Sequence, residues 1–304
     1  MILETPSGVT LGYDDLGAND DPAVVLIGGL ATQRTVWTDT LCTALVDSGH
    51  RVIRFDNRDM GQSSWWDAPS GEVLLGLLTK GLSPEDRLPY TIDDLAADTV
   101  GLMDALALQR AHVVGMSMGG LIAQSVAVRW PDRVHTLVSM MSTTGNPSLP
   151  SSTAAALQAL MTPLVDPFDQ AAVTDLAIMQ QRVIGSPLFP MPDDYVRDIV
   201  SLNFARGNNP EGALRQWLAS SGAGDRRAQL ASIRVPTLVL HGRDDPLVPP
   251  PAGEDTARTI PGAKLRLIDG WGHNIPPSIG PLLAGELMSF WGATLNGGQS
   301  NVGS

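Results

Sequence analysis

Short apolar runs alternate with longer stretches of helical periodicity along most of this chain. The runs are rich in valine, leucine and isoleucine and are continuously apolar, as expected for strands covered on both faces. They predict strands over residues 22–29, 50–55, 111–115, 134–140, 235–242 and 264–269. The intervening stretches predict helices over Trp37–Ser48, Thr91–Ala107, Met118–Trp130, Ala252–Ile260 and Pro277–Trp291. This alternation predicts an α/β protein with a mostly parallel, doubly wound sheet.

The alternation stops between about residues 142 and 233. This stretch is rich in alanine, leucine, methionine and proline and contains no convincing strand. We interpret it as a helical cap over the carboxyl edge of the sheet. The predicted domains are therefore a first core part over 1–141, the cap over 142–233, a second core part over 234–295 and a disordered tail over 296–304.

Composition and charge narrow the classes of protein further. The chain has 304 residues, of which 43% are hydrophobic and 17% charged, enough for one large domain or two small ones. Its formal net charge of −12 disfavours binding to nucleic acid. Cys42 is the only cysteine, which excludes an intrachain disulfide and a cysteine-rich metal site. The N-terminal residues lack a signal-peptide pattern and no run is long enough to span a bilayer, so we expect a soluble, cytoplasmic protein.

The sequence HVVGMSMGG (112–120) contains the strongest candidate for chemistry. Gly115, Ser117 and Gly119 fit the pattern G-x-S-x-G between a predicted strand and a predicted helix. That context is typical of a nucleophile elbow, in which a strained backbone projects a serine hydroxyl above the sheet. The alternative is a glycine-rich turn with a passive serine. Because the pattern and its context coincide, we interpret Ser117 as a nucleophile.

A serine hydroxyl needs a histidine as base and an acid that orients the histidine. In elbow-type enzymes the order along the chain is serine, acid, histidine. His273 lies in a glycine-flanked loop after the last predicted strand, whereas His135 and His241 come too early. The acid is expected in the loop RDDPLVP. We choose Asp245, which is followed by a short apolar turn ending in proline, and keep Asp244 as the alternative.

Donors for an oxyanion complete the predicted site. One is the backbone N–H of Met118, the residue after the serine, whose side chain is also expected to form part of the pocket wall. The other is expected in the loop after the first predicted strand, where the Leu30 N–H is the candidate. The predicted substrate pocket includes Gly29, Trp37, Met141, Trp217 and Val248.

Several segments together resemble the α/β-hydrolase superfamily. They are IGGL with Trp37 downstream, FDNRDMGQS (55–63), HVVGMSMGG, GRDDPLVP and GWGH, in the order of that family. One departure is Gly28, which stands where the family usually has the histidine of a His-Gly pair. DNRDMGQS, RAHVVGMSMGG and GWGHNIPPS further resemble the carboxylesterases that include aclacinomycin methylesterase. The resemblance implies an α/β-hydrolase fold with a helical cap after the sixth strand, and an esterase acting on a small or polyketide-like ester.

These features predict a serine carboxylesterase that forms an acyl-enzyme with a small to medium, largely apolar ester. No cofactor or metal is expected, because the chain lacks the nucleotide-binding glycine patterns, H-E-x-x-H and C-x-x-C. The expected partner is a small-molecule ester, and a homodimer is left open. Asp56, Arg58 and Gln62 are interpreted as structural residues that hold a tight turn near the oxyanion loop. The same triad would also serve lactone opening, perhydrolysis or hydrolysis of a C–C bond beside a carbonyl.

Two further classes of function stay open. One is a ligand-binding protein that kept the fold and lost turnover. The other is an interaction scaffold that uses Trp65 and Trp66 in the irregular segment 64–89. For the apolar run EVLLGLLTKGL in the same segment, a buried satellite helix is the favoured interpretation.

Overall fold

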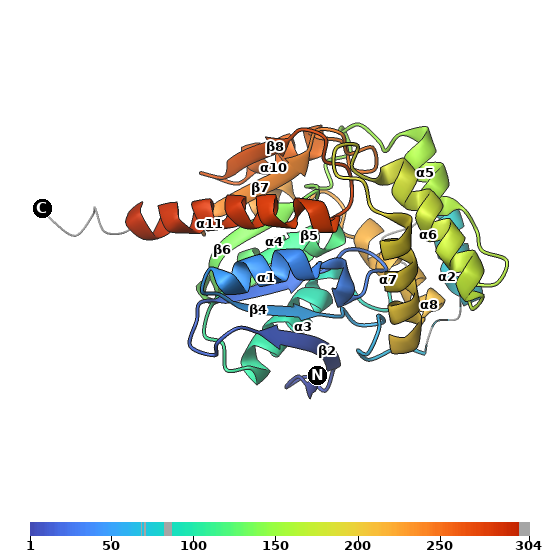
Figure 1. Ribbon diagram of the computed structural model, residues 1–304, viewed down its shortest axis with the longest axis horizontal. Coiled ribbons are helices and arrows are strands. Elements are labelled where there is room, and N and C mark those ends of the chain that lie inside the picture. Colours follow the sequence, from blue (N-terminus) through green and yellow to red (C-terminus); the bar gives the residue numbers. More distant parts are fainter. Residues whose placement is uncertain (68, 70, 82–86, 298–304) are drawn as a thin grey trace, which may run out of the picture.

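Eight strands form one sheet through the centre of the described protein (Figure 1). The computed structural model describes residues 1–67, 69, 71–81 and 87–297. The strand order is β1-β2-β4-β3-β5-β6-β7-β8. The strands are β1 (Ile2–Glu4), β2 (Thr10–Leu16), β3 (Ala23–Ile27), β4 (Arg51–Phe55), β5 (Ala111–Met116), β6 (Val134–Met140), β7 (Thr237–Gly242) and β8 (Lys264–Ile268).

The predicted parallel sheet is confirmed for β3 to β8, which pair in parallel. Every residue of β3, β5 and β7 is buried, which explains their unbroken apolar runs. The first two strands were not predicted; β1 pairs antiparallel with β2, and β2 antiparallel with β4. In β2 the acidic residues Asp14 and Asp15 interrupt the apolar pattern, because they form ion pairs with arginines of β4.

Helices cover both faces of the sheet. One face packs against α1 (Asp39–Asp47) and α11 (Gly280–Gly297), which lie side by side. The other face packs against α3 (Ile92–Ala105) and α4 (Met118–Arg129), with α10 (Pro251–Thr259) beside β7 and β8. The predicted tail begins inside α11, which continues to Gly297; the rest of it lies outside the described residues.

The predicted helical insertion after the sixth strand lies between β6 and β7. It contains α5 (Ala154–Met161), α6 (Gln170–Ile184), α7 (Asp193–Arg206), α8 (Pro210–Ser221) and the short α9 (Arg227–Leu230). In Figure 1 the helices α5 to α8 stand together at one end of the molecule, and we call them the cap. Helix α2 (Gly71–Lys80) packs on α8 and buries Leu74, while Val73 and Leu75 are about half exposed.

The order of the strands fixes where a site can form. The chain passes from β3 to β4 on one side and then returns to β5 on the other side of β3. In doubly wound sheets, ligands bind at such a reversal, outside the carboxyl ends of the strands. The loops that leave β3 and β5 therefore flank the expected position of a site. Among the described residues, no helix combines the length and apolar character needed to cross a membrane.

Candidate active site

Ser117 occupies a sharp turn between β5 and α4. Its backbone has φ 54° and ψ −120°, in the positive-φ region that residues other than glycine rarely adopt. Serine at a helix N-cap usually accepts a hydrogen bond from the first turn. Ser117 occupies the N-cap of α4 without making that bond in the described structure. Its hydroxyl is directed elsewhere, which argues against a passive turn residue.

The two glycines of the pattern are required by close backbone packing. A Cβ on Gly119 would lie 2.1 Å from the Ile27 carbonyl oxygen, and a Cβ on Gly115 would lie 2.0 Å from the Gly119 carbonyl oxygen. Any side chain at either position would push β3, β5 and α4 apart. The elbow is therefore held by the packing of backbone on backbone.

His273 connects the serine to an acid from the loop after β7. Its Nε2 lies 3.0 Å from Ser117 Oγ, and its Nδ1 donates to Asp245 Oδ2 at 2.7 Å. The other oxygen of Asp245 accepts the backbone N–H groups of Leu247 and Val248 at 2.9 and 2.8 Å. Because Nδ1 carries the proton toward the carboxylate, Nε2 has a lone pair for the serine hydroxyl. Such an arrangement allows an imidazole to take the proton of a nucleophilic hydroxyl.

His241 lies near the same acid but is engaged differently. Its Nε2 is 3.6 Å from Asp245 Oδ2 and donates to the Val248 carbonyl oxygen at 2.7 Å. Burial lowers the pKa of His241, which favours the neutral ring. It therefore supports the Asp245 turn without adding a charge beside His273.

Asp244, the alternative acid, has a different set of partners. Its Oδ2 accepts the Gly270 N–H at 2.7 Å, at the start of the loop that carries His273. The side chain is exposed, unlike that of Asp245, which is 3% exposed. The geometry thus gives Asp244 a role in holding the histidine loop.

The loop after β3 lies against the serine. A Cβ on Gly29 would lie 3.4 Å from Ser117 Cβ. The N–H groups of Leu30 and Met118 make no hydrogen bond within the described part of the chain. The Met118 side chain is buried in the core between the sheet and α3 and α4. The structure thus leaves two backbone donors near the turn available.

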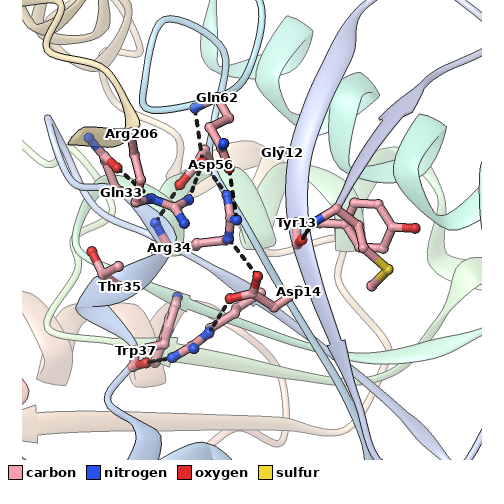
Figure 2. A network of polar contacts seen from close by, with 12 residues as sticks. Gly12, Tyr13, Asp14, Gln33, Arg34, Thr35, Trp37, Asp56, Gln62 and Arg206 are labelled. Atoms are coloured by element: carbon pink, nitrogen blue, oxygen red, sulfur yellow. Dashed lines mark hydrogen bonds and ion pairs between the residues drawn. The ribbon is translucent and has the colours of Figure 1, made fainter. Parts of the chain in front are cut away.

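A buried polar network fixes the continuation of this loop (Figure 2). Asp56 is fully buried and accepts hydrogen bonds from the backbone and guanidinium of Arg34, at 2.7 and 2.6 Å. It also accepts from Gln62 N and from Arg206 of α7 at 2.8 Å. Arg206 further donates to Gln33 Oε1 at 2.9 Å. The network, which sequence analysis did not predict in this form, joins the cap to the loop after β3.

A second polar joint links the cap to the histidine loop. The His273 N–H donates to the Ile184 carbonyl oxygen at 2.7 Å, and the Gly272 N–H donates to Ser186 Oγ at 3.0 Å. Ser186 also donates to Asn274 Oδ1 at 2.5 Å. No sequence pattern identified Ser186, because its role depends on contacts across 86 residues.

The predicted pocket residues occupy different environments. Gly29 lies beside Ser117, and Val248 supports Asp245 through its N–H. Met141, at the end of β6, and Trp37 are fully buried in the core cluster beneath α1 and α11. Trp217 of α8 is partly exposed. Their contact with substrate stays a prediction.

A cavity of about 200 Å³ lies between the loop after β3 and the cap. Apolar side chains of Met60, Val173, Val200 and Phe204 line it together with Ala31, next to Leu30. None of the five predicted pocket residues lines it. A larger hollow of about 420 Å³ lies at the β8 edge against α11, and it contains no predicted site residue. Neither hollow is lined by Ser117, Asp245 or His273, and only the smaller one borders the loop after β3.

Comparison with known proteins agrees with this architecture. Residues 22–277 match the family model described as the alpha/beta hydrolase fold, and the chain belongs to this family. It is 29% identical to the rhodomycin D methylesterase DauP of Streptomyces sp. (strain C5), over 94% of this chain and 96% of that protein. It is 27% identical to 3-oxoadipate enol-lactonase 2 of Acinetobacter baylyi, with 87% of each chain covered. The enol-lactonase structure from Burkholderia xenovorans LB400 superposes with a TM-score of 0.67 at 23% identity, covering 95% of this chain and 99% of that one.

Proposed function

We propose that this protein is a serine carboxylesterase that hydrolyses neutral carboxylic esters through an acyl-enzyme. The observation that carries the proposal is the hydrogen-bonded series Ser117–His273–Asp245 at the strand reversal. The similarity to the rhodomycin D methylesterases supports ester hydrolysis as the reaction class.

In the first half-reaction Ser117 Oγ attacks the ester carbonyl carbon while His273 Nε2 takes the hydroxyl proton. The tetrahedral intermediate collapses, and the same imidazole returns the proton to the leaving alcohol. In the second half-reaction His273 removes a proton from water, which attacks the acyl carbonyl carbon. The bond to Ser117 Oγ then breaks, His273 returns the proton to that oxygen, and the acid is released. Asp245 keeps the imidazole oriented through both steps.

The developing negative charge needs donors that are already in place. The N–H groups of Leu30 and Met118 are assigned this role, since both lack another acceptor among the described residues. Met118 is also the first residue of α4, so the positive end of the helix dipole lies beside the oxyanion. Loss of one such donor typically costs about 3 kcal/mol of transition-state stabilisation.

The cavity beside Ala31 supports a neutral, largely apolar substrate of small to medium size. Its lining combines apolar side chains with neutral polar ones and includes no charged side chain that could pair with an ionised substrate; the polar residues are Gln33, Asn203, Asn208 and Asn209. The part of the ester remote from the reacting carbonyl is expected to occupy this cavity. The lactonase relative makes lactones a useful second substrate class to test, because ring opening uses the same steps.

A fluorophosphonate probe tests the nucleophile. The wild-type protein is expected to be labelled at one serine, and Ser117→Ala to lose labelling while it melts at the same temperature. Hydrolysis of methyl, acetyl and longer acyl esters, and of lactones, then defines the substrate class. A folded wild-type protein that neither reacts with the probe nor turns over any ester would instead favour a ligand-binding role.

A further inference from the structure

Two consecutive peptide groups in the loop after β3 are held by side chains. The Gly29 carbonyl oxygen accepts the Thr32 hydroxyl at 3.0 Å and the Thr32 N–H at 3.4 Å. The next peptide is held from the cap, since the Ala31 N–H donates to Gln216 Oε1 at 2.9 Å. Ala31 has φ 56°, a conformation that costs free energy in a residue with a side chain and so needs support.

The first of these peptides contains the Leu30 N–H. Because a trans peptide is planar, its N–H points opposite to its C=O. The Thr32 hydroxyl pulls the Gly29 carbonyl toward residue 32, and the Leu30 N–H therefore points away from it. Rotation of this peptide would place a carbonyl where the donor stands and would remove one oxyanion donor.

The second support comes from a buried amide of the cap. Gln216 is fully buried in α8, and its Nε2 donates to the Arg58 carbonyl oxygen at 2.9 Å. Both ends of its amide are thus used, one on each of two core loops. The amide fixes the Leu30–Ala31 peptide, so Leu30 is restrained on both sides.

Gly28 is the position where this chain departs from the His-Gly pair usual in its family. A Cβ at this position would lie 2.9 Å from Thr32 Oγ1 and 3.6 Å from a methyl group of Val36. The glycine therefore makes room for the threonine hydroxyl that holds the Gly29 carbonyl.

From these contacts we infer that Thr32 and Gln216 are positioning residues that aim the Leu30 N–H at the oxyanion. This inference rests on the proposed esterase function. In this inference the Gln216 amide of the cap and the Thr32 hydroxyl together hold the peptide that carries the Leu30 N–H. The glycine at position 28 leaves room for that hydroxyl. Neither residue touches the reacting atoms in this assignment; both act through the Leu30 peptide.

The test compares Thr32→Val, which removes the hydroxyl, with Thr32→Ser, which keeps it. On p-nitrophenyl acetate, Thr32→Val is expected to lower kcat by about 10- to 100-fold with KM changed little, because only part of a donor's contribution is lost. Thr32→Ser should stay within about threefold of the wild type, since the hydroxyl is retained. Thr99→Val is the matched control, because the Thr99 hydroxyl is buried but bonds within α3.

A second measurement distinguishes a Leu30 N–H that points in the wrong direction from a general loss of structure around the site. A trifluoromethyl ketone forms a tetrahedral adduct whose oxyanion needs the same donors. Its affinity should fall in Thr32→Val and Gln216→Met by the same factor as kcat/KM, while the pH profile of kcat/KM keeps its midpoint.

Two results would overturn the inference: turnover in both variants equal to that of Thr99→Val, or reduced turnover with unchanged ketone affinity. Gln216→Met is also expected to weaken the attachment of the cap, so the melting temperature of each variant is measured as well. If Gln216→Met melts at a lower temperature than the wild type, the test rests on Thr32→Val. A wild type without turnover or labelling would remove the proposed function and this inference together, whereas an active wild type with unaffected variants removes the inference alone.

Discussion

The turn that carries Ser117 and the loop after β3 beside it are held in different ways. The elbow after β5 is fixed by backbone packed on backbone, with glycines where any Cβ would collide. The loop after β3 is fixed by side chains, among them Gln216 and Arg206 from the cap. The elbow therefore depends on local sequence, whereas the loop after β3 depends on residues about 170 to 190 positions away. We expect changes in the cap to alter catalysis through the second loop and to leave the first unaffected.

The largest expected effect leaves both loops intact. His273→Ala removes the base, and kcat is expected to fall by about 10³- to 10⁴-fold or more, with the thermal melting temperature nearly unchanged. Any rate that remains above the uncatalysed reaction measures what the two loops supply without the base. Steady-state kinetics on a chromogenic ester is the measurement, and near-normal turnover would remove His273 from its role.

Gly119→Ala disturbs the elbow where it packs against the end of β3 and against Gly28, the first residue of the loop after β3. The added Cβ would lie 2.1 Å from the Ile27 carbonyl oxygen, and so the strand and helix must move apart. We expect the free energy of unfolding to fall by about 3 kcal/mol or more. Urea denaturation provides the measurement. Gly285→Ala in α11 is the matched control, because a Cβ there meets nothing within 4 Å, and it should be neutral or slightly stabilising.

Acid should weaken the strand that carries the elbow through protonation of His112. His112, at the amino end of β5, stacks on Trp291 with ring centroids 4.5 Å apart, and its Nδ1 lies 2.8 Å from Thr136 Oγ1. Burial lowers its pKa to about 3, with His135 and His50 nearby adding to the effect. Between pH 6.5 and about 3, His112 therefore stays neutral in the folded protein, whereas in the unfolded chain, with its ordinary pKa of about 6.5, it takes up a proton.

Stability from His112 is therefore fully present above pH 6.5 and is lost as the pH falls toward 3. One proton corresponds to about 1.4 kcal/mol per pH unit, or about 2 kcal/mol between pH 6.5 and 5. His112→Gln should flatten the pH dependence of urea unfolding by about this amount. The exposed His135 is the control, and His135→Gln should change the slope less. Equal slopes in wild type and His112→Gln would contradict the prediction.

The smallest expected effect tests the cap joint. Arg206→Met removes two hydrogen bonds from the network of Figure 2, while Asp56 keeps its pair with Arg34. We expect a loss of about 1 kcal/mol in stability, since the lost bonds are charge-assisted but partly replaced. A severalfold fall in kcat should accompany it. Arg182→Met removes an exposed ion pair with Asp193 and should have little effect on either quantity. Identical behaviour of the two variants would mean that the cap and the loop are independent.

The same contrast explains how far sequence alone could reach. The apolar runs of β3, β5 and β7 predicted the parallel sheet, because these strands are buried on both faces. The positions of Ser117, Asp245 and His273 could be proposed because the flanking glycines and the order of the loops are visible in the sequence itself. Strand β2 was missed since Asp14 and Asp15 hide its pattern until their arginine partners are known. Gln216 and Arg206 are ordinary polar residues of helices and Ser186 is an ordinary loop serine, so their roles could not be predicted from sequence; each depends on contacts with residues distant in the chain.

The amide of Gln216 has a practical consequence for redesign. One way to alter the specificity of this chain would be to exchange its insertion between β6 and β7 for that of another protein. Here such a chimera would also replace the acceptor that restrains the Ala31 peptide. A chimera that keeps the glutamine at the matching turn of α8 should retain turnover. So should one that takes residues 28–32 from the same protein as the new insertion. A chimera chosen for pocket shape alone should bind its new ester and hydrolyse it slowly.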